Sequence, residues 1–221
     1  NSFLKIKNFH SKFNDWMFGC LSFDLTDEVF NLPSESIDNL TSEHISFFIP
    51  KYVILIKENK LEVLTHENKE STESLINQIS CYSCNEQKMN TISFKARESK
   101  KSYLQKIDKI KHHIKRGDIY EINYCQEFFN NNVLISPHNI FYQLNKLTKS
   151  PIASFIKNDK IYVMGFSPER YLSKNNSKII SQPIKGTSRR SNDPDEDTCL
   201  FNKLLKSQKD ISENIMIVDL V

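Results

Sequence analysis

The sequence contains 221 residues, of which 38% are hydrophobic, so it can bury the core of one large domain or of part of one. Its 30 basic and 27 acidic side chains give a net charge of +3, and their even spread favours a solvated surface over a nucleic-acid or membrane partner. No apolar run reaches the length of a membrane-spanning helix, and no secretory signal is visible.

The five cysteines do not form a disulfide framework, because their number is odd and they are scattered: Cys20, Cys81, Cys84, Cys125 and Cys199. Cys81 and Cys84 have the spacing of a redox or zinc pair. Neither a second such pair nor a histidine pair completes four zinc ligands, so we interpret the spacing as chance. A reducing cytoplasm fits this usage best.

The two ends of the sequence lack ordinary start and stop signals. The chain begins at Asn1 without an initiator methionine, and it stops at Val221 inside an apolar run without a helix stop signal. We therefore expect a fragment that is incomplete at both ends.

The first part of the chain predicts strands followed by one helix. Residues 15–23 are typical of a buried strand that passes close to other backbone at Gly19. Residues 47–57 and 60–66 predict two strands joined by a tight turn, and residues 67–84 predict a helix followed by a polar loop. None of these elements carries an obvious chemical group.

A helix is predicted from Ser99 to Gly117. Apolar side chains recur there at helical spacing: Tyr103, Ile107, Ile110 and Ile114. Lysines fill the opposite face, and Gly117 stands where a C-terminal cap is expected. A calmodulin target or a membrane-surface helix has the same outline, but we favour a helix packed on a core.

The remainder predicts strands and helices in separate blocks. Residues 118–129 alternate like a strand, with Glu121 on one side, and residues 136–148 predict a helix with Pro137 in its first turn. Four strands then follow as an antiparallel meander: 151–157, 160–166, 169–173 and 178–182. Helices are expected over residues 194–207 and 210–221. The blocks indicate an α+β fold of antiparallel sheets covered by helices, and no nucleotide-binding glycine loop is present.

Three short motifs carry the candidate chemistry: Ser167-Pro168-Glu169-Arg170, Pro183-Ile184-Lys185-Gly186-Thr187 and Ser212-Glu213-Asn214. Each is weak alone, because a glutamate after a proline is usually a solvated turn residue and one early in a helix usually serves the dipole. Lys185 is different, because Pro183 fixes one backbone angle before it and Gly186 lets the chain bend sharply or pass close to a ligand after it. Such a constraint suits an amine that must be aimed at one place.

Together, and in this order, the motifs resemble those of the chorismate-utilising enzymes, in which Glu-Asn-x-Met-Ile-Val-Asp-Leu matches residues 213–220. Within that superfamily, Lys185 is similar to the lysine of aminodeoxychorismate synthase component I, whereas anthranilate, isochorismate and salicylate synthases usually carry alanine there. The resemblance is good over residues 99–221 and poor over residues 1–98. It implies a single chorismate-binding domain over 1–221, of which 99–221 is the catalytic portion.

The resemblance also implies roles for individual residues. Lys185 would attack C2 of the chorismate ring while the C4 hydroxyl leaves, and ammonia would then add at C4 and expel the lysine. Glu169 matches the general acid that protonates the hydroxyl, with Phe166 and Tyr171 as its apolar surround. Glu213 matches one of two glutamates that hold Mg²⁺. Asp219 is a poor second ligand, because six helical positions turn it away from Glu213.

Substrate contacts are expected from Gly186, Thr187 and Glu121. Glu121 occupies a position where water-using relatives tend to have lysine and ammonia-using relatives glutamine, so either a role with ammonia or a half-exposed strand residue remains open. The amine of Lys185 must be neutral to attack. Arg189, Arg190 and a bound cation would favour that form, whereas a substrate with two carboxylates would oppose it.

The function implied is conversion of chorismate and ammonia to 4-amino-4-deoxychorismate for 4-aminobenzoate and folate synthesis, with ammonia supplied from glutamine by a separate amidotransferase subunit. Two alternatives remain: anthranilate synthase component I, and a non-catalytic binding protein that keeps the fold. Because the second metal glutamate and the carboxylate clamp of the family lie beyond Val221, we expect these 221 residues alone to be inactive.

Overall fold

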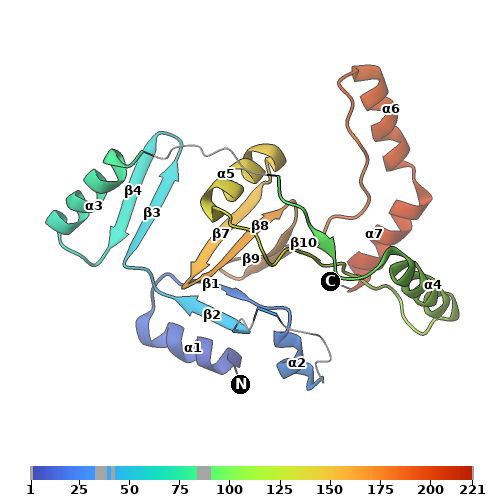
Figure 1. Ribbon diagram of the computed structural model, residues 1–221, viewed down its shortest axis with the longest axis horizontal. Coiled ribbons are helices and arrows are strands. Elements are labelled where there is room, and N and C mark those ends of the chain that lie inside the picture. Colours follow the sequence, from blue (N-terminus) through green and yellow to red (C-terminus); the bar gives the residue numbers. More distant parts are fainter. Residues whose placement is uncertain (1, 33–38, 41–42, 84–90, 221) are drawn as a thin grey trace. The chain divides into compact units, whose positions relative to one another are not determined.

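A computed structural model of the chain describes residues 2–32, 39–40, 43–83 and 91–220 (Figure 1). The chain separates into two compact units, Asn1–Asn85 and Glu86–Val221. Each unit is a mixture of helices and antiparallel strands, which confirms the predicted α+β class. No helix in the described part of the chain is long and apolar enough to cross a membrane.

The described residues of the first unit form two antiparallel strand pairs and three helices: α1 (Ser2–Phe13), β1 (Phe18–Leu21), α2 (Leu25–Phe30), β2 (Ile45–Phe48), β3 (Tyr52–Lys57), β4 (Lys60–Thr65) and α3 (Lys69–Cys81). β1 pairs with β2, and β3 pairs with β4. The two-residue turn between β3 and β4 is confirmed, with Glu58 in the left-handed region at φ 54°. The close approach at Gly19 is also confirmed, because a Cβ there would lie 1.9 Å from the carbonyl oxygen of Ser46.

Two expectations for this unit differ from the structure. The strand predicted over residues 47–57 is two strands, since the chain breaks between β2 and β3 at Pro50, which has no amide hydrogen for a ladder. Helices α1 and α2 were not predicted at all. Cys81 is exposed and free at the end of α3, whereas Cys84 lies outside the described residues.

The second unit opens with β5 (Lys95–Ala96) and the predicted helix, α4 (Lys100–Arg116). The hydroxyl of Ser99 caps α4 by accepting a hydrogen bond from the amide of Ser102 at 3.2 Å. Gly117 ends the helix in the left-handed conformation at φ 80°, and its amide donates back to carbonyl oxygens of the last turn. Both caps match the sequence signals, so the predicted bounds of this helix are confirmed.

The strand predicted over residues 118–129 is wrong for most of its length. Only β6 (Phe128–Phe129) is a strand, paired with β5, and residues 118–127 have no ladder partner among the described residues. Side chains hold this segment instead: Tyr124 and Gln126 both donate hydrogen bonds to Glu98. The alternating pattern therefore reflects side-chain anchoring rather than a sheet.

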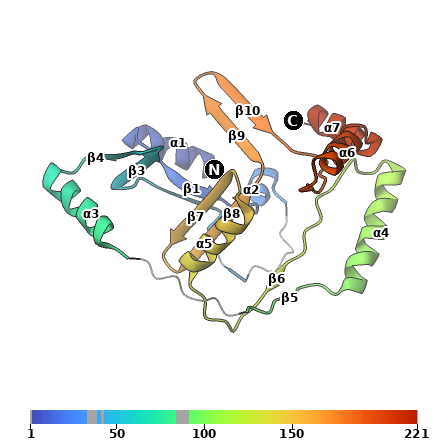
Figure 2. The ribbon, with the colours of Figure 1, turned by 90° about the horizontal axis from the view of Figure 1, so that it is seen from above.

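Helix α5 (Pro137–Thr148) covers the hairpin of β7 (Ile152–Asn158) and β8 (Ile161–Ser167), as Figure 2 shows. The ring of Phe141 lies 5.3 Å from the rings of both Phe155 and Phe166, measured between centroids. This aromatic contact is the clearest case, within the described residues, of a helix packed on a sheet.

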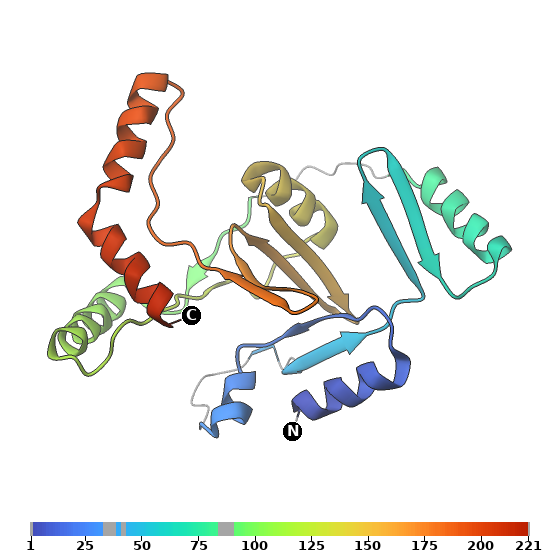
Figure 3. The ribbon, with the colours of Figure 1, turned by 180° about the vertical axis from the view of Figure 1, so that it is seen from behind.

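Strands β9 (Arg170–Asn175) and β10 (Lys178–Gln182) form a second hairpin (Figure 3). The predicted four-stranded meander is therefore wrong in its pairing, because β7–β8 and β9–β10 are separate two-stranded sheets. The chain turns between them at Pro168, which cannot donate to a ladder. The unit ends with α6 (Pro194–Leu205) and α7 (Gln208–Leu220), which start and stop within two residues of the predicted bounds.

Candidate active site

The first motif forms a tight turn between β8 and β9 that presents Glu169. The hydroxyl of Ser167 accepts a hydrogen bond from the amide of Glu169 at 3.1 Å and donates one to its carbonyl oxygen at 2.9 Å. Ser150 fixes the turn from the other side, because its hydroxyl donates to the carbonyl oxygen of Ser167 at 2.5 Å. Glu169 is half-buried in this frame.

The carboxylate of Glu169 joins the first motif to the second. Its Oε1 accepts a hydrogen bond of 2.7 Å from the amide of Ile184, the residue directly before Lys185. Fifteen residues of sequence separate the two partners. The structure therefore brings the predicted acid and the predicted nucleophile into one place through the backbone.

The second motif leaves β10 through an irregularity in the strand pairing. The register with β9 shifts between Ile180 and Gln182, and the chain then continues without a ladder through Pro183 to Ser191. Gly186 adopts φ 78°, a conformation that side chains other than hydrogen rarely allow. Lys185 and Gly186 are half-buried, and Thr187 is exposed.

Gly186 also brings the second motif against the start of α7. A Cβ at this glycine would lie 3.0 Å from Cβ of Asp210 and 3.1 Å from its Oδ1. Asp210 belongs to the first turn of α7, and the half-buried Glu213 follows three residues later on the same side of the helix. Glu169 thus contacts the loop of Lys185, and that loop approaches the first turn of α7, the helix that carries the third motif.

Asp210 is a residue of this site that sequence reasoning missed. The signal was available, since three positions separate it from Glu213 and carboxylates at that helical spacing share a face. Within the described residues, no group of three or more histidine, cysteine or carboxylate side chains is placed to hold a metal. The role of Glu213 in binding Mg²⁺ therefore stays a prediction.

Glu121 is half-buried in the segment between α4 and β6. None of the hydrogen bonds and ion pairs found among the described residues links it to Lys185, Glu169 or Glu213. Its side chain therefore remains a candidate contact for substrate rather than part of the assembled group.

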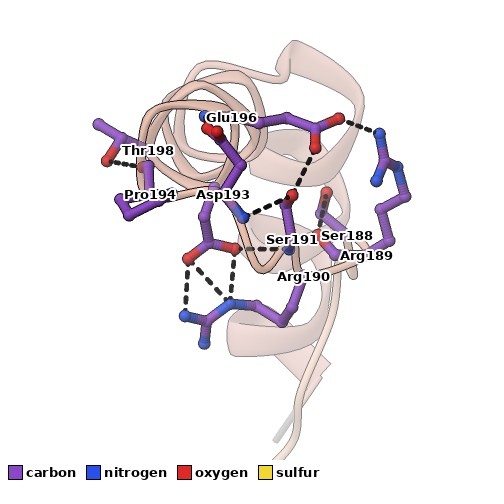
Figure 4. A network of polar contacts seen from close by, with 9 residues as sticks. Ser188, Arg189, Arg190, Ser191, Asp193, Pro194, Glu196 and Thr198 are labelled. Carbon is purple, nitrogen blue, oxygen red and sulfur yellow. Dashed lines mark hydrogen bonds and ion pairs between the residues drawn. The ribbon is translucent and has the colours of Figure 1, made fainter.

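Arg189 and Arg190 are tied to the N-terminal turn of α6, as Figure 4 shows. Arg190 donates to the carboxylate of Asp197 from Nε at 2.9 Å and from Nη2 at 2.7 Å, and Arg189 donates to Glu196. Ser191 completes the network: its amide donates to Asp197 at 3.0 Å, and its hydroxyl donates to Glu196.

The ion pairs of Arg189 with Glu196 and of Arg190 with Asp197 keep both carboxylates in their charged form. The Arg190 guanidinium, helped by the Ser191 amide, lowers the pKa of Asp197 to about 2, and hydrogen bonds from Ser191 and Arg189 lower the pKa of Glu196. Both arginines thus have their charge balanced by a carboxylate of the first turn of α6.

The apolar surround expected for Glu169 is also incomplete. Tyr171 is 89% exposed and Phe166 is engaged with Phe141 of α5. Tyr171 therefore does not shield the carboxylate.

Among solved structures, the chain resembles anthranilate synthase component I from Streptococcus pneumoniae TIGR4, with a TM-score of 0.77 and 20% sequence identity. The match covers 92% of this chain and 48% of that one. This similarity shows that the two proteins share the chorismate-enzyme type of α+β fold. Residues 2–221 also match the family described as chorismate binding enzyme, and the chain belongs to that family.

Curated relatives fall into two groups. The chain is 36% identical over 131 residues to aminodeoxychorismate synthase component 1 of Klebsiella aerogenes, covering 59% of this chain and 29% of that protein. It is 26% identical over 205 residues to the Escherichia coli K12 protein of the same name, covering 92% and 45%. Anthranilate synthase component 1 of Acetivibrio thermocellus is 31% identical over 137 residues, covering 60% and 27%. The chain thus spans less than half the length of these relatives.

Proposed function

We propose that the protein is the chorismate-binding component of an aminodeoxychorismate synthase, which converts chorismate and ammonia to 4-amino-4-deoxychorismate. The observation that carries this proposal is the hydrogen bond between Glu169 and the amide of Ile184, because it sets a carboxyl group beside the loop of Lys185. The lysine at position 185 also supports the proposal, because anthranilate, isochorismate and salicylate synthases usually carry alanine at the matching position.

In the proposed reaction, the neutral amine of Lys185 forms a bond to C2 of the ring. The ring double bonds shift and the bond between C4 and its hydroxyl breaks. Ammonia then adds at C4, the double bonds shift back, and the amine of Lys185 leaves from C2. The half-buried position of Lys185 and the fixed backbone at Gly186 support this role, because a nucleophile works best when it is aimed and partly removed from water.

Glu169 supplies the proton for the departing hydroxyl, so that water leaves rather than hydroxide. Its Oε1 is occupied by the amide of Ile184, which leaves Oε2 to carry the proton. The same hydrogen bond holds the carboxyl group in one orientation relative to the Lys185 loop.

The donor set near α7 fits a magnesium ion in part. Glu213 and Asp210 offer carboxylate oxygens from adjacent turns, and Mg²⁺ prefers one or two carboxylates together with retained waters and substrate oxygens. When bound, the ion would neutralise a carboxylate of chorismate. Glu213 and Asp210 would hold it, while Gly186, Thr187 and Glu121 would contact the substrate.

Ammonia would come from glutamine through a separate amidotransferase subunit. The name component 1, carried by the relatives of K. aerogenes and E. coli, supports a second component. Excess ammonium salt would replace that subunit in an assay.

Product analysis on the full-length protein, given chorismate, Mg²⁺ and ammonium, tests the proposal. Wild type is expected to form 4-amino-4-deoxychorismate without pyruvate, and Lys185→Ala to lose most of this activity because the nucleophile is gone. In a serine protease, removal of the covalent nucleophile costs on the order of a millionfold in kcat, which sets the scale of the loss expected here.

The similarity to anthranilate synthases shows which experimental result would contradict the proposal. Release of anthranilate and pyruvate, undiminished by Lys185→Ala, would make Lys185 a bystander and assign the protein to that branch. Binding of chorismate without turnover of any kind would favour a non-catalytic protein of this fold.

A further inference from the structure

The carboxylate of Glu98 is the centre of a polar cluster that lies apart from the candidate site. Its side chain is 13% exposed and ion-paired with Lys106 of α4 at 2.8 Å. Its two oxygens also accept hydrogen bonds from the hydroxyls of Ser102 at 2.5 Å and Tyr124 at 2.6 Å. Three donors thus converge on one carboxylate, and they come from α4 and from the segment after it.

Further hydrogen bonds, made by the backbone of Glu98 and by Arg97, hold the end of the segment that follows α4. The carbonyl oxygen of Glu98 accepts a hydrogen bond from the side chain of Gln126 at 3.0 Å. Arg97 donates twice to the carboxylate of Glu127, at 2.7 and 2.9 Å, and its amide donates to the carbonyl oxygen of Glu127 at 2.8 Å. The end of the segment is therefore fixed without a strand ladder.

The beginning of the segment is fixed by the end of α4. The amide of Asp118 donates to the carbonyl oxygen of His113 at 3.0 Å, and the carboxylate of Asp118 lies 2.8 Å from Nδ1 of His113. Residues 119–123, which include Glu121, are left as a short irregular span between two anchors. The orientation of Glu121 therefore depends on those anchors.

We propose that Glu98 is a positioning residue that fixes the span of residues 119–123 and thereby sets how Glu121 meets the substrate. Glu98 is the main anchor because the loss of its carboxylate would leave three donors without their shared acceptor, two of them on α4 and one on Tyr124. The ring of Tyr124 also lies 5.4 Å from that of Tyr103, so its position is coupled to the apolar face of α4. The link to substrate rests on the function proposed above, whereas the anchoring does not.

Amide hydrogen exchange on the full-length protein without substrate tests the anchoring alone. Glu98→Ala is expected to speed exchange about tenfold at the amide of Arg97, which donates to the carbonyl oxygen of Glu127, because the hydrogen bonds of a charged group that hold the segment beside it are lost. Tyr124→Phe removes a single hydroxyl and is expected to give a smaller increase, even if Glu98→Ala folds poorly. The control is Glu73→Ala, which breaks an exposed pair with Lys69 on α3 and is expected to leave exchange at this amide unchanged. Unchanged exchange in both Tyr124→Phe and Glu98→Ala would overturn the proposal.

A double-mutant cycle then tests the link to substrate. Glu98→Ala and Glu121→Ala are each expected to raise KM for chorismate about tenfold with little change in kcat, and the double variant is expected to be no worse than Glu121→Ala. Additive effects on KM would mean that Glu98 does not act through Glu121, which contradicts the proposal. If the protein does not use chorismate at all, the proposed function fails while the exchange result still decides whether Glu98 anchors the segment.

Discussion

At the scale of single residues, we propose two tasks for Glu169 that use different oxygens of its carboxyl group. Oε1 holds the amide of Ile184, and we assign Oε2 to proton delivery. The first task needs only an acceptor, whereas the second needs an acid. Substitutions that keep the hydrogen-bond acceptor but remove the acid therefore separate the two tasks.

Glu169→Gln keeps an oxygen that accepts from Ile184 but has no proton to give, so kcat is expected to fall by about a hundredfold or more with chorismate affinity nearly unchanged. Glu169→Ala removes both properties and is expected to weaken chorismate binding about tenfold as well. Titration calorimetry gives the affinities and steady-state kinetics gives kcat. Equal affinities for the two variants would contradict a positioning role for Oε1.

Gly186 offers a second prediction at this scale, with Gly117 as its matched control. Both glycines have positive φ, 78° and 80°, but a Cβ at Gly186 would meet Asp210 at 3.0 Å, whereas nothing lies within 4 Å of one at Gly117. Alanine costs about 1–2 kcal/mol of backbone strain at either position. Only Gly186→Ala is expected to reduce turnover, because it displaces the Lys185 loop from α7.

Kinetics and thermal unfolding of the two alanine variants give the comparison. Equal stability losses with full activity in both would show that contact between Gly186 and α7 does not matter for the site.

At the scale of elements, the ion pairs at the start of α6 make stability depend on pH. The pKa of Asp197 is lowered from 3.8 to about 2 by Arg190 and by the Ser191 amide. A lowered pKa means that the stabilisation is fully present above pH 3.8 and is lost as the pH falls towards 2. The ion pair between Arg190 and Asp197 should therefore be intact at neutral pH.

Asp197→Asn is expected to lower the Tm of the full-length protein near neutral pH, with the difference from wild type shrinking between pH 4 and pH 2. Asp195→Asn is the control, because Asp195 lies in the same helical turn and forms no ion pair among the described residues. Differential scanning calorimetry over that pH range measures the effect. A difference in Tm that persists at the acid end would rule out the charged pair as its cause.

Elements with local signals were predictable, and those fixed by distant contacts were not. Ser99 and Gly117 delimit α4, and short turns near Glu58 and Asn176 delimit hairpins, because a cap or turn depends on adjacent residues. The segment after α4 was misread as a strand, since its anchor is Glu98, twenty or more residues earlier. Likewise, Lys185, Glu169 and Glu213 were predicted as site residues from motifs, but the place of Asp210 against Gly186 needed the fold.

At the scale of the whole molecule, little apolar surface is buried within the described residues. Leu25 and Ile217, each 6% exposed, are the buried apolar residues there, while large ones such as Ile215 and Val218 of α7 are 65% and 78% exposed. Exposed apolar area on this scale is unusual for a stable monomer. Much of the apolar surface of the described residues is thus left uncovered.

We therefore expect this 221-residue chain, expressed alone, to bind a hydrophobic dye strongly, to unfold without a sharp transition and to be inactive. Dye fluorescence and calorimetry, with a stably folded protein of similar size as control, measure these properties. A single cooperative transition with no dye binding would contradict the expectation.

The bond between Glu169 and residue 184 draws its donor from the main chain, and the side chain of Ile184 is 49% exposed. Site 184 should therefore accept almost any amino acid in a saturation library scored for activity. Proline alone is excluded by chemistry, because it has no amide hydrogen to give. If most substitutions at position 184 keep activity while those at position 169 abolish it, the contact depends on the backbone amide of residue 184 and not on its side chain.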